Sequence, residues 1–105
     1  MKRYRVLFLA PALDDLYELY RYIARKSSRE TADGYLARLE TFCKSLRTLP
    51  QRGTAVPGRV AGLRRMGFER RACILFRVAE DRVEILRILY GGQDLEPVLE
   101  SILTS

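Results

Sequence analysis

Residues 86–95 read LRILYGGQDL, and this stretch contains the transition that decides the fold. An apolar run ends at a tyrosine, two glycines follow, and Asp94 begins a segment with helical spacing. The pattern predicts a strand over Arg82–Tyr90 and then a short helix capped by Asp94. Arg87 lies inside the apolar run, where an unpaired guanidinium would be costly.

Two further segments extend this strand into a sheet. Arg70–Val78 precedes it by a tight turn, so the two are expected to form a β-hairpin. Leu63–Phe68 predicts another strand, and Gln51 to Gly62 is expected to be a loop. Alternation along the last strand gives two faces, Val83, Ile85, Arg87 and Leu89 on one, and Glu84, Leu86, Ile88 and Tyr90 on the other. Both faces are largely apolar, so both sides of the sheet should be covered.

The first half of the chain predicts a strand and two helices. After a strand over Tyr4–Leu9, apolar residues recur at helical intervals over 12–26 and again over 28–48. Ser27 and Glu30 have capping-box spacing at the start of the second helix. The short connection implies an antiparallel helical hairpin. The expected core face of the first helix is Leu13, Leu16, Tyr17, Tyr20, Ile23 and Ala24.

The order of elements predicts an α+β fold in one domain, residues 1–105. An N-terminal strand and an antiparallel helical hairpin would pack on a small antiparallel β-sheet, followed by a short C-terminal helix. That last helix needs a partner surface, because it has an apolar stripe of Leu95, Val98, Leu99, Ile102 and Leu103. No apolar run approaches the ~20 residues that cross a bilayer, so we expect no membrane association.

The net charge, the absence of histidine and the two cysteines exclude some classes of function. The 105-residue chain has a net charge of +6, and residues 50–78 hold seven arginines against Glu69 alone. This basic region could attract phosphate or an acidic protein, or it could be an ordinary solvated surface. There is no histidine, which excludes Ser–His and Cys–His catalytic pairs, and we expect no metal and no cofactor. Cys43 and Cys73 lack metal-binding spacing and suit buried thiols in a reducing cytoplasm.

Four stretches, in this order, carry a family resemblance: FLAPALDDLYELYRYIA, TADGYLARLETFCKSLRTLPQRG, GLRRMGF and VEILRILYGGQDL. Together they resemble the ParE toxins of the RelE/ParE superfamily, the toxins of bacterial toxin–antitoxin pairs, over essentially the whole chain. The resemblance implies a ParD-like antitoxin whose C-terminal segment wraps the toxin in a hetero-oligomer. It also implies DNA gyrase as the target, inhibited by protein–protein contact. The RelE branch instead cleaves messenger RNA on the ribosome.

The two branches give the same residues different roles. A ribonuclease would use Arg64, Arg87 and Tyr90, but arginine and tyrosine titrate near ~12.5 and ~10 and are poor bases at neutral pH. The sequence therefore favours a binding toxin without catalytic residues. Direct nucleic-acid binding and an orphaned, inactive toxin both stay open. The expected partner-binding residues are Arg59, Arg64, Arg65, Arg71, Arg77, Arg87, Tyr90, Leu99 and Ile102.

Each of these residues also has a structural interpretation. Arg87 could form a salt bridge with an acid of the hairpin or tail, such as Glu96 or Glu100. Arg64 could pair with a carboxylate, and Tyr90 could pack on the last helix. Arg87 and Tyr90 have opposite strand parity and should point to opposite sides of the sheet unless a bulge intervenes.

Overall fold

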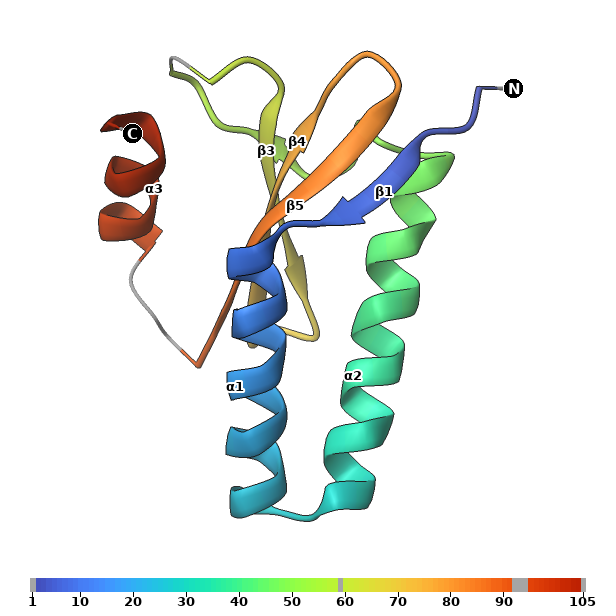
Figure 1. The fold of residues 1–105 in the computed structure, drawn as a ribbon, viewed down its shortest axis with the longest axis vertical. Coiled ribbons are helices and arrows are strands. Elements are labelled where there is room, and N and C mark those ends of the chain that lie inside the picture. Colours follow the sequence, from blue (N-terminus) through green and yellow to red (C-terminus); the bar gives the residue numbers. More distant parts are fainter. Residues whose placement is uncertain (1, 59, 92–94, 105) are drawn as a thin grey trace.

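The computed structural model describes residues 2–58, 60–91 and 95–104. It contains the expected strands and helices in the expected order, together with a 3₁₀ helix and a short strand that were not expected (Figure 1). They are β1 (Arg5–Phe8), α1 (Ala10–Lys26), α2 (Arg29–Lys44), the 3₁₀ helix η1 (Ser45–Arg47), β2 (Thr54–Ala55), β3 (Leu63–Phe68), β4 (Ala72–Val78), β5 (Arg82–Tyr90) and α3 (Leu95–Thr104). Helix α1 begins two residues before the predicted start, with Pro11 in its first turn, where a proline removes no helical hydrogen bond. The predicted cap of α3, Asp94, lies outside the described residues.

The five strands form one sheet in the order β1-β5-β4-β3-β2. All neighbouring pairs are antiparallel except β1 and β5, which run parallel. A parallel pair needs a long crossover, and here the crossover is nearly the whole chain. The predicted loop 51–62 was wrong in one detail, because Thr54–Ala55 pairs with β3 as the edge strand β2.

Strand β4 begins at Ala72, two residues later than predicted. Glu69 and Arg70 have left-handed backbone conformations, with φ of 48° and 65°, and form the turn between β3 and β4. A residue in that conformation cannot continue a strand.

Helices α1 and α2 lie antiparallel against one face of the sheet, and their lower halves extend beyond it (Figure 1). Their buried residues meet those of the sheet in one apolar cluster. Its buried members include Leu19, Ile23, Tyr35, Leu39, Cys43, Met66, Phe68, Ile74, Phe76, Val83, Ile85 and Ile88. The predicted packing of the helical hairpin on the sheet is confirmed.

A β-bulge divides β5 into two halves. Leu75 and Phe76 of β4 pair with Arg87 and Ile85, so Leu86 has no partner across the ladder. The core side of the strand therefore consists of Val83, Ile85, Ile88 and Tyr90. The predicted faces, which assumed unbroken alternation, were wrong beyond this point. Arg87 and Tyr90 still have opposite parity, because both follow the bulge.

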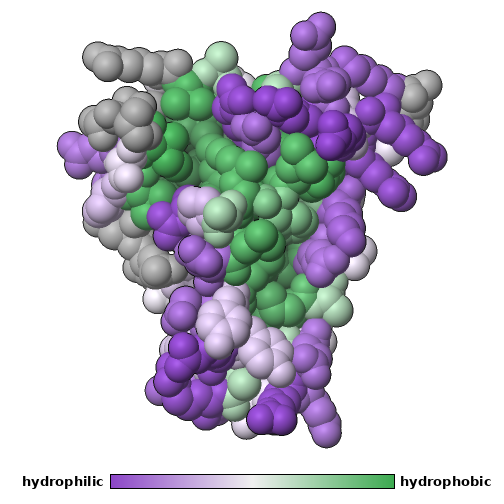
Figure 2. Space-filling model, in the orientation of Figure 1, coloured by the Kyte–Doolittle hydropathy of each residue, from purple (hydrophilic) through white to green (hydrophobic). Residues whose placement is uncertain are grey.

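Not all of the predicted core face of α1 is buried. Leu13 is 53% and Tyr17 63% exposed, so these two side chains point away from the sheet. Figure 2 shows an apolar band across the middle of this face of the molecule, over β1, β5 and the start of α1. Leu7 and Leu9 next to β5 are half-buried and Leu13 is exposed, so this face presents apolar side chains to the outside.

Helix α3 lies to one side of the sheet in Figure 1. Its residues Leu95, Glu96 and Leu99 line a small hollow together with Arg65 of β3 and the segment 55–57. The helix therefore covers part of the second face of the sheet, near β2 and β3, as predicted. Among the described residues, no helix is long and apolar enough to cross a membrane.

Candidate functional site

Arg87 is paired, and its partner is Asp15 of α1. Nε and one terminal nitrogen of Arg87 donate to the two carboxylate oxygens of Asp15, at 2.7 and 3.0 Å. The backbone N–H of Ile88 donates to the same carboxylate at 2.8 Å. These hydrogen bonds raise the pKa of Arg87 above its ordinary value. The predicted salt bridge to an acid of the hairpin is confirmed, but Glu96 and Glu100 were the wrong acids to name.

Asp15 supplies a hydrogen-bond acceptor to a backbone N–H of β5 that has no neighbouring strand to pair with. Strand β1 ends at Phe8, and its last bond to β5 runs from the N–H of Leu9 to the carbonyl of Ile85. Beyond that point β5 becomes an edge, and an unpaired N–H there would need another partner. Helix α1 leads back along this edge, so its second turn brings the carboxylate to Ile88.

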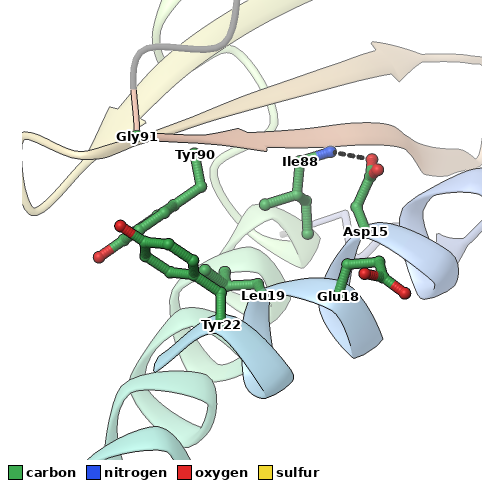
Figure 3. Close-up of a pocket in the computed structure, with 7 residues that line it drawn as sticks. All are labelled: Asp15, Glu18, Leu19, Tyr22, Ile88, Tyr90 and Gly91. Atoms are coloured by element: carbon green, nitrogen blue, oxygen red, sulfur yellow. Dashed lines mark hydrogen bonds between the residues drawn. The ribbon is translucent and has the colours of Figure 1, made fainter. Parts of the chain in front are cut away.

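The hydrogen bonds of Asp15 with Arg87 and Ile88 form a clasp between α1 and β5. A hollow of about 350 Å³ lies beside this clasp, between α1 and the end of β5 (Figure 3). Its walls are Asp15, Glu18, Leu19, Tyr22, Ile88, Tyr90 and Gly91. The rings of Tyr22 and Tyr90 meet edge to face, with centroids 5.7 Å apart. Two carboxylates and two aromatic rings thus converge here, and neither Arg64 nor Arg65 lines the hollow.

Tyr90 belongs to an aromatic cluster on the hairpin side of the sheet. Its ring also packs edge-on against Tyr35 of α2, with centroids 5.7 Å apart. Burial, followed by the nearby Tyr90, raises the pKa of Tyr35 to about 12. Tyr90 therefore packs on the helical hairpin, and the predicted packing on the last helix is not what the rings show.

Arg64 binds backbone carbonyls instead of the predicted carboxylate. Its guanidinium donates to the carbonyls of Gln51, Arg52 and Gly53 at 2.9–3.2 Å. These three carbonyls belong to the loop between η1 and β2. Arg64 thus fastens that loop to the sheet, which is a structural role.

The second face of the sheet carries the remaining predicted arginines of the strands. Arg77 bonds to Glu84 at 2.8 Å, and Arg82 bonds to the other oxygen of that carboxylate at 3.1 Å. Arg65 is exposed and lies near Glu96 of α3 in the hollow described above. This face is therefore basic, and Glu84 neutralises part of its charge.

The other predicted partner-binding residues are scattered. Arg71 is exposed beside the β3–β4 turn, whereas Leu99 and Ile102 are half-buried on α3. Arg59 lies outside the described residues. The structure therefore does not gather the eight predicted residues that it describes into one site.

Sequence reasoning missed Asp15, the partner of Arg87, and the other side chains of α1 that line the hollow beside it. Asp15, Glu18 and Tyr22 recur at helical spacing on α1, a signal that was available but indistinguishable from ordinary helix surface. Arg38 and Glu69, which form a bidentate ion pair, are 31 positions apart and carry no local signal. Within the part of the chain that the structure describes, no three potential metal ligands cluster.

Comparisons with known proteins agree on the fold. A family model described as "ParE toxin of type II toxin-antitoxin system, parDE" matches residues 6–95. The structure is similar to a chain of the "Chromosomal ParDE TA system from P. aeruginosa", with a TM-score of 0.73, 24% identity, and coverage of 86% of this chain and 98% of that one. It is also similar to a chain of the toxin–antitoxin complex RelBE2 from Mycobacterium tuberculosis, with a TM-score of 0.63, 25% identity, and coverage of 85% and 99%. No curated protein matches the sequence.

Proposed function

Because this chain belongs to the ParE toxin family of type II toxin–antitoxin systems, we propose that it inhibits DNA gyrase by protein–protein binding and that a ParD-like antitoxin neutralises it. The coarser assignment, a toxin with an antitoxin partner, follows from the family. The gyrase target and the kind of antitoxin are the proposal. Gyrase acts on the chromosome, so the proposed site of action is the cytoplasm.

One observation carries the choice of a binding toxin over a ribonuclease. The groups that a ribonuclease would need do not converge on a common point. Arg87 is held by Asp15, Arg64 is held by three backbone carbonyls, and the Tyr90 ring lies among the aromatic rings of the hairpin. Cleavage through a 2′-hydroxyl needs a base, an acid and charge stabilisation within reach of one phosphate. Arginines that are held in this way by the fold favour a binding toxin over a ribonuclease.

Charge supports the proposed antitoxin. Arg65, Arg70 and Arg71 are exposed on β3 and on the turn that follows it, and the whole chain has a net charge of +6. An acidic segment would approach such a surface faster and bind it more tightly than a neutral one.

The ribonuclease alternative retains one favourable observation. Arg77 and Arg82 lie on the second face of the sheet with a single carboxylate, Glu84, between them. That arrangement leaves positive charge that could contact the phosphates of an RNA strand.

A supercoiling assay separates these functions. Purified toxin is added to gyrase and relaxed plasmid, with and without its cognate antitoxin. Loss of supercoiling or accumulation of cleaved plasmid, reversed by antitoxin, is the expected result. Normal supercoiling together with cleavage of ribosome-bound message would overturn the gyrase proposal and favour the ribonuclease.

A further inference from the structure

An apolar groove lies between α2 and the turn that joins β3 to β4. It has a volume of about 420 Å³ and is lined by Ala37, Arg38, Thr41, Phe42, Phe68 and Glu69. The rings of Phe42 and Phe68 in its wall pack against each other, with centroids 5.0 Å apart. The groove is separate from the clasp of Asp15 and from the second face of the sheet.

The turn that forms one wall of this groove is strained. Glu69 and Arg70 are the only residues other than glycine with positive φ among those the structure describes. Phe68 pairs with Ala72, so the connection has three residues, and its first two positions suit asparagine or glycine, which tolerate the left-handed conformation. Strained backbone persists where the surroundings fix it, and it concentrates at binding and catalytic sites.

Arg38 is the neighbour that fixes the turn. Its Nε and one terminal nitrogen donate to the two carboxylate oxygens of Glu69, at 2.8 and 3.1 Å. These bonds lower the pKa of Glu69 below its ordinary value. The ion pair joins α2 to the turn and gives the groove a defined end.

Beyond the groove, the turn presents positive charge without a counter-ion. Arg70 and Arg71 are both exposed, and neither side chain forms an ion pair with any described residue. Arg38, by contrast, is neutralised by Glu69. An apolar groove is thus followed directly by two available guanidinium groups.

We propose that this groove anchors the antitoxin, through a segment that packs one large apolar side chain against Phe42 and Phe68 and places neighbouring carboxylates on Arg70 and Arg71. Charge complementarity selects this occupant, because an acidic chain is the one that a toxin of net charge +6 attracts. The inference rests on the proposed neutralisation by an acidic, ParD-like antitoxin. It adds the place of contact and the chemistry of the residues that make it.

A pair of matched substitutions tests the groove. Thr41→Arg places a long side chain in the groove without removing a core atom, because Thr41 is exposed. Thr54→Arg makes the same change on the exposed edge strand β2. We expect Thr41→Arg to weaken antitoxin binding in calorimetry by about tenfold or more, and Thr54→Arg to change it by less than about twofold.

Variants of Arg70 test the turn. Arg70→Gly relieves the left-handed strain and removes one charge, so it should raise Tm by about 4 °C while weakening antitoxin binding. Arg70→Lys keeps the charge and should bind nearly as the wild type does. A residue that served only the fold would not show higher stability together with weaker binding.

The outcomes distinguish this inference from the function on which it rests. If wild-type toxin inhibits gyrase and binds antitoxin, but Thr41→Arg binds antitoxin equally well, the groove is not the anchor and the proposed function stands. If Thr41→Arg loses gyrase inhibition and keeps full antitoxin affinity, the groove belongs to gyrase and the inference is wrong. If wild-type toxin binds no antitoxin at all, the proposed function itself fails.

Discussion

Asp15 accepts three hydrogen bonds, two from Arg87 and one from the backbone of Ile88, and so joins α1 to β5. Its side chain is 14% exposed and that of Arg87 is 29% exposed. Partly buried charges of this kind are expensive to separate, because the remaining partner keeps its desolvation cost and loses its compensation. The clasp is therefore more important for stability than the ion pairs on the open surface.

Asp15→Ala is expected to lower the free energy of unfolding by about 2 kcal/mol. It removes both bonds to Arg87 and leaves the Ile88 N–H without its acceptor. Asp15→Asn keeps an oxygen for that N–H and should cost less. Urea unfolding measures both, and equal losses in the two variants would show that the backbone bond contributes nothing.

The identity of the partners of Arg87 and Arg64 shows where sequence reasoning stops. That a guanidinium in an apolar strand needs an acceptor follows from desolvation alone, and both arginines have acceptors. Which acceptor each one finds depends on tertiary geometry, since Asp15 and Arg87 are 72 positions apart. Arg64 faces backbone carbonyls of a loop, and no residue type in the sequence marks a carbonyl as an acceptor.

At the level of elements, the start of α2 is the clearest boundary to test. Ser27 was the predicted N-cap of α2, but the structure shows Ser28 in that position. The Ser28 hydroxyl accepts a hydrogen bond from the backbone N–H of Thr31 at 3.0 Å. Two adjacent serines give nearly the same pattern, so the sequence could not choose between them. The geometry chooses Ser28, which has extended backbone angles, while the N–H of Ser27 still bonds to Ile23 of α1.

Ser28→Ala should therefore destabilise the protein by about 1 kcal/mol, through loss of the bond to the helix N-terminus. Ser27→Ala is the matched control and should cost clearly less. Thermal unfolding of the two variants compares them directly. The assignment of the cap would be wrong if the order of the two Tm values were reversed.

The bulge in β5 is the other element-level feature that the sequence concealed. In the run VEILRILY both alternating sets contain leucine or isoleucine, so either phase could face the core. Only the register with β4 reveals that the phase changes at Leu86. Strand existence, hairpin pairing and the helical hairpin were predictable, because each depends on local periodicity. The side on which each residue points was not, because it depends on a neighbouring strand.

At the scale of the whole molecule, burial raises the pKa of two thiols and one phenol among the described residues, and the shifts of Cys43 and Tyr35 are the largest. Burial raises the pKa of Cys43 from 9.0 to about 12 and that of Tyr35 from 10.0 to about 12. The Tyr35 hydroxyl is buried and has no hydrogen-bond partner among the described residues. Both groups are neutral when protonated, so the folded state holds these protons more tightly than the unfolded state does.

The contribution of these two groups to stability is therefore fully present below pH 9, where both are protonated in the folded and the unfolded state. It should decline as pH rises from about 9 towards 12, because the unfolded chain ionises first. Urea unfolding at several pH values in this range measures the slope. Cys43→Ala and Tyr35→Phe should each make the decline shallower, whatever they do to stability at neutral pH. Tyr17→Phe, the same change at an exposed site, is the control. A slope that neither core substitution alters would contradict the assignment.

The parallel pairing of β1 with β5 has a consequence for synthesis. Arg5 pairs in register with Arg82, so β1, the first strand to be synthesised, can pair only after β5, the last strand, has been synthesised. At translation rates of 5–20 residues per second, that wait lasts roughly 4 to 16 s. During it the helical hairpin has no completed sheet to cover its apolar face. A chain that is released before β5 is translated lacks the strand that pairs with both β1 and β4. Such a truncated chain cannot complete its sheet, so incomplete translation yields no folded toxin.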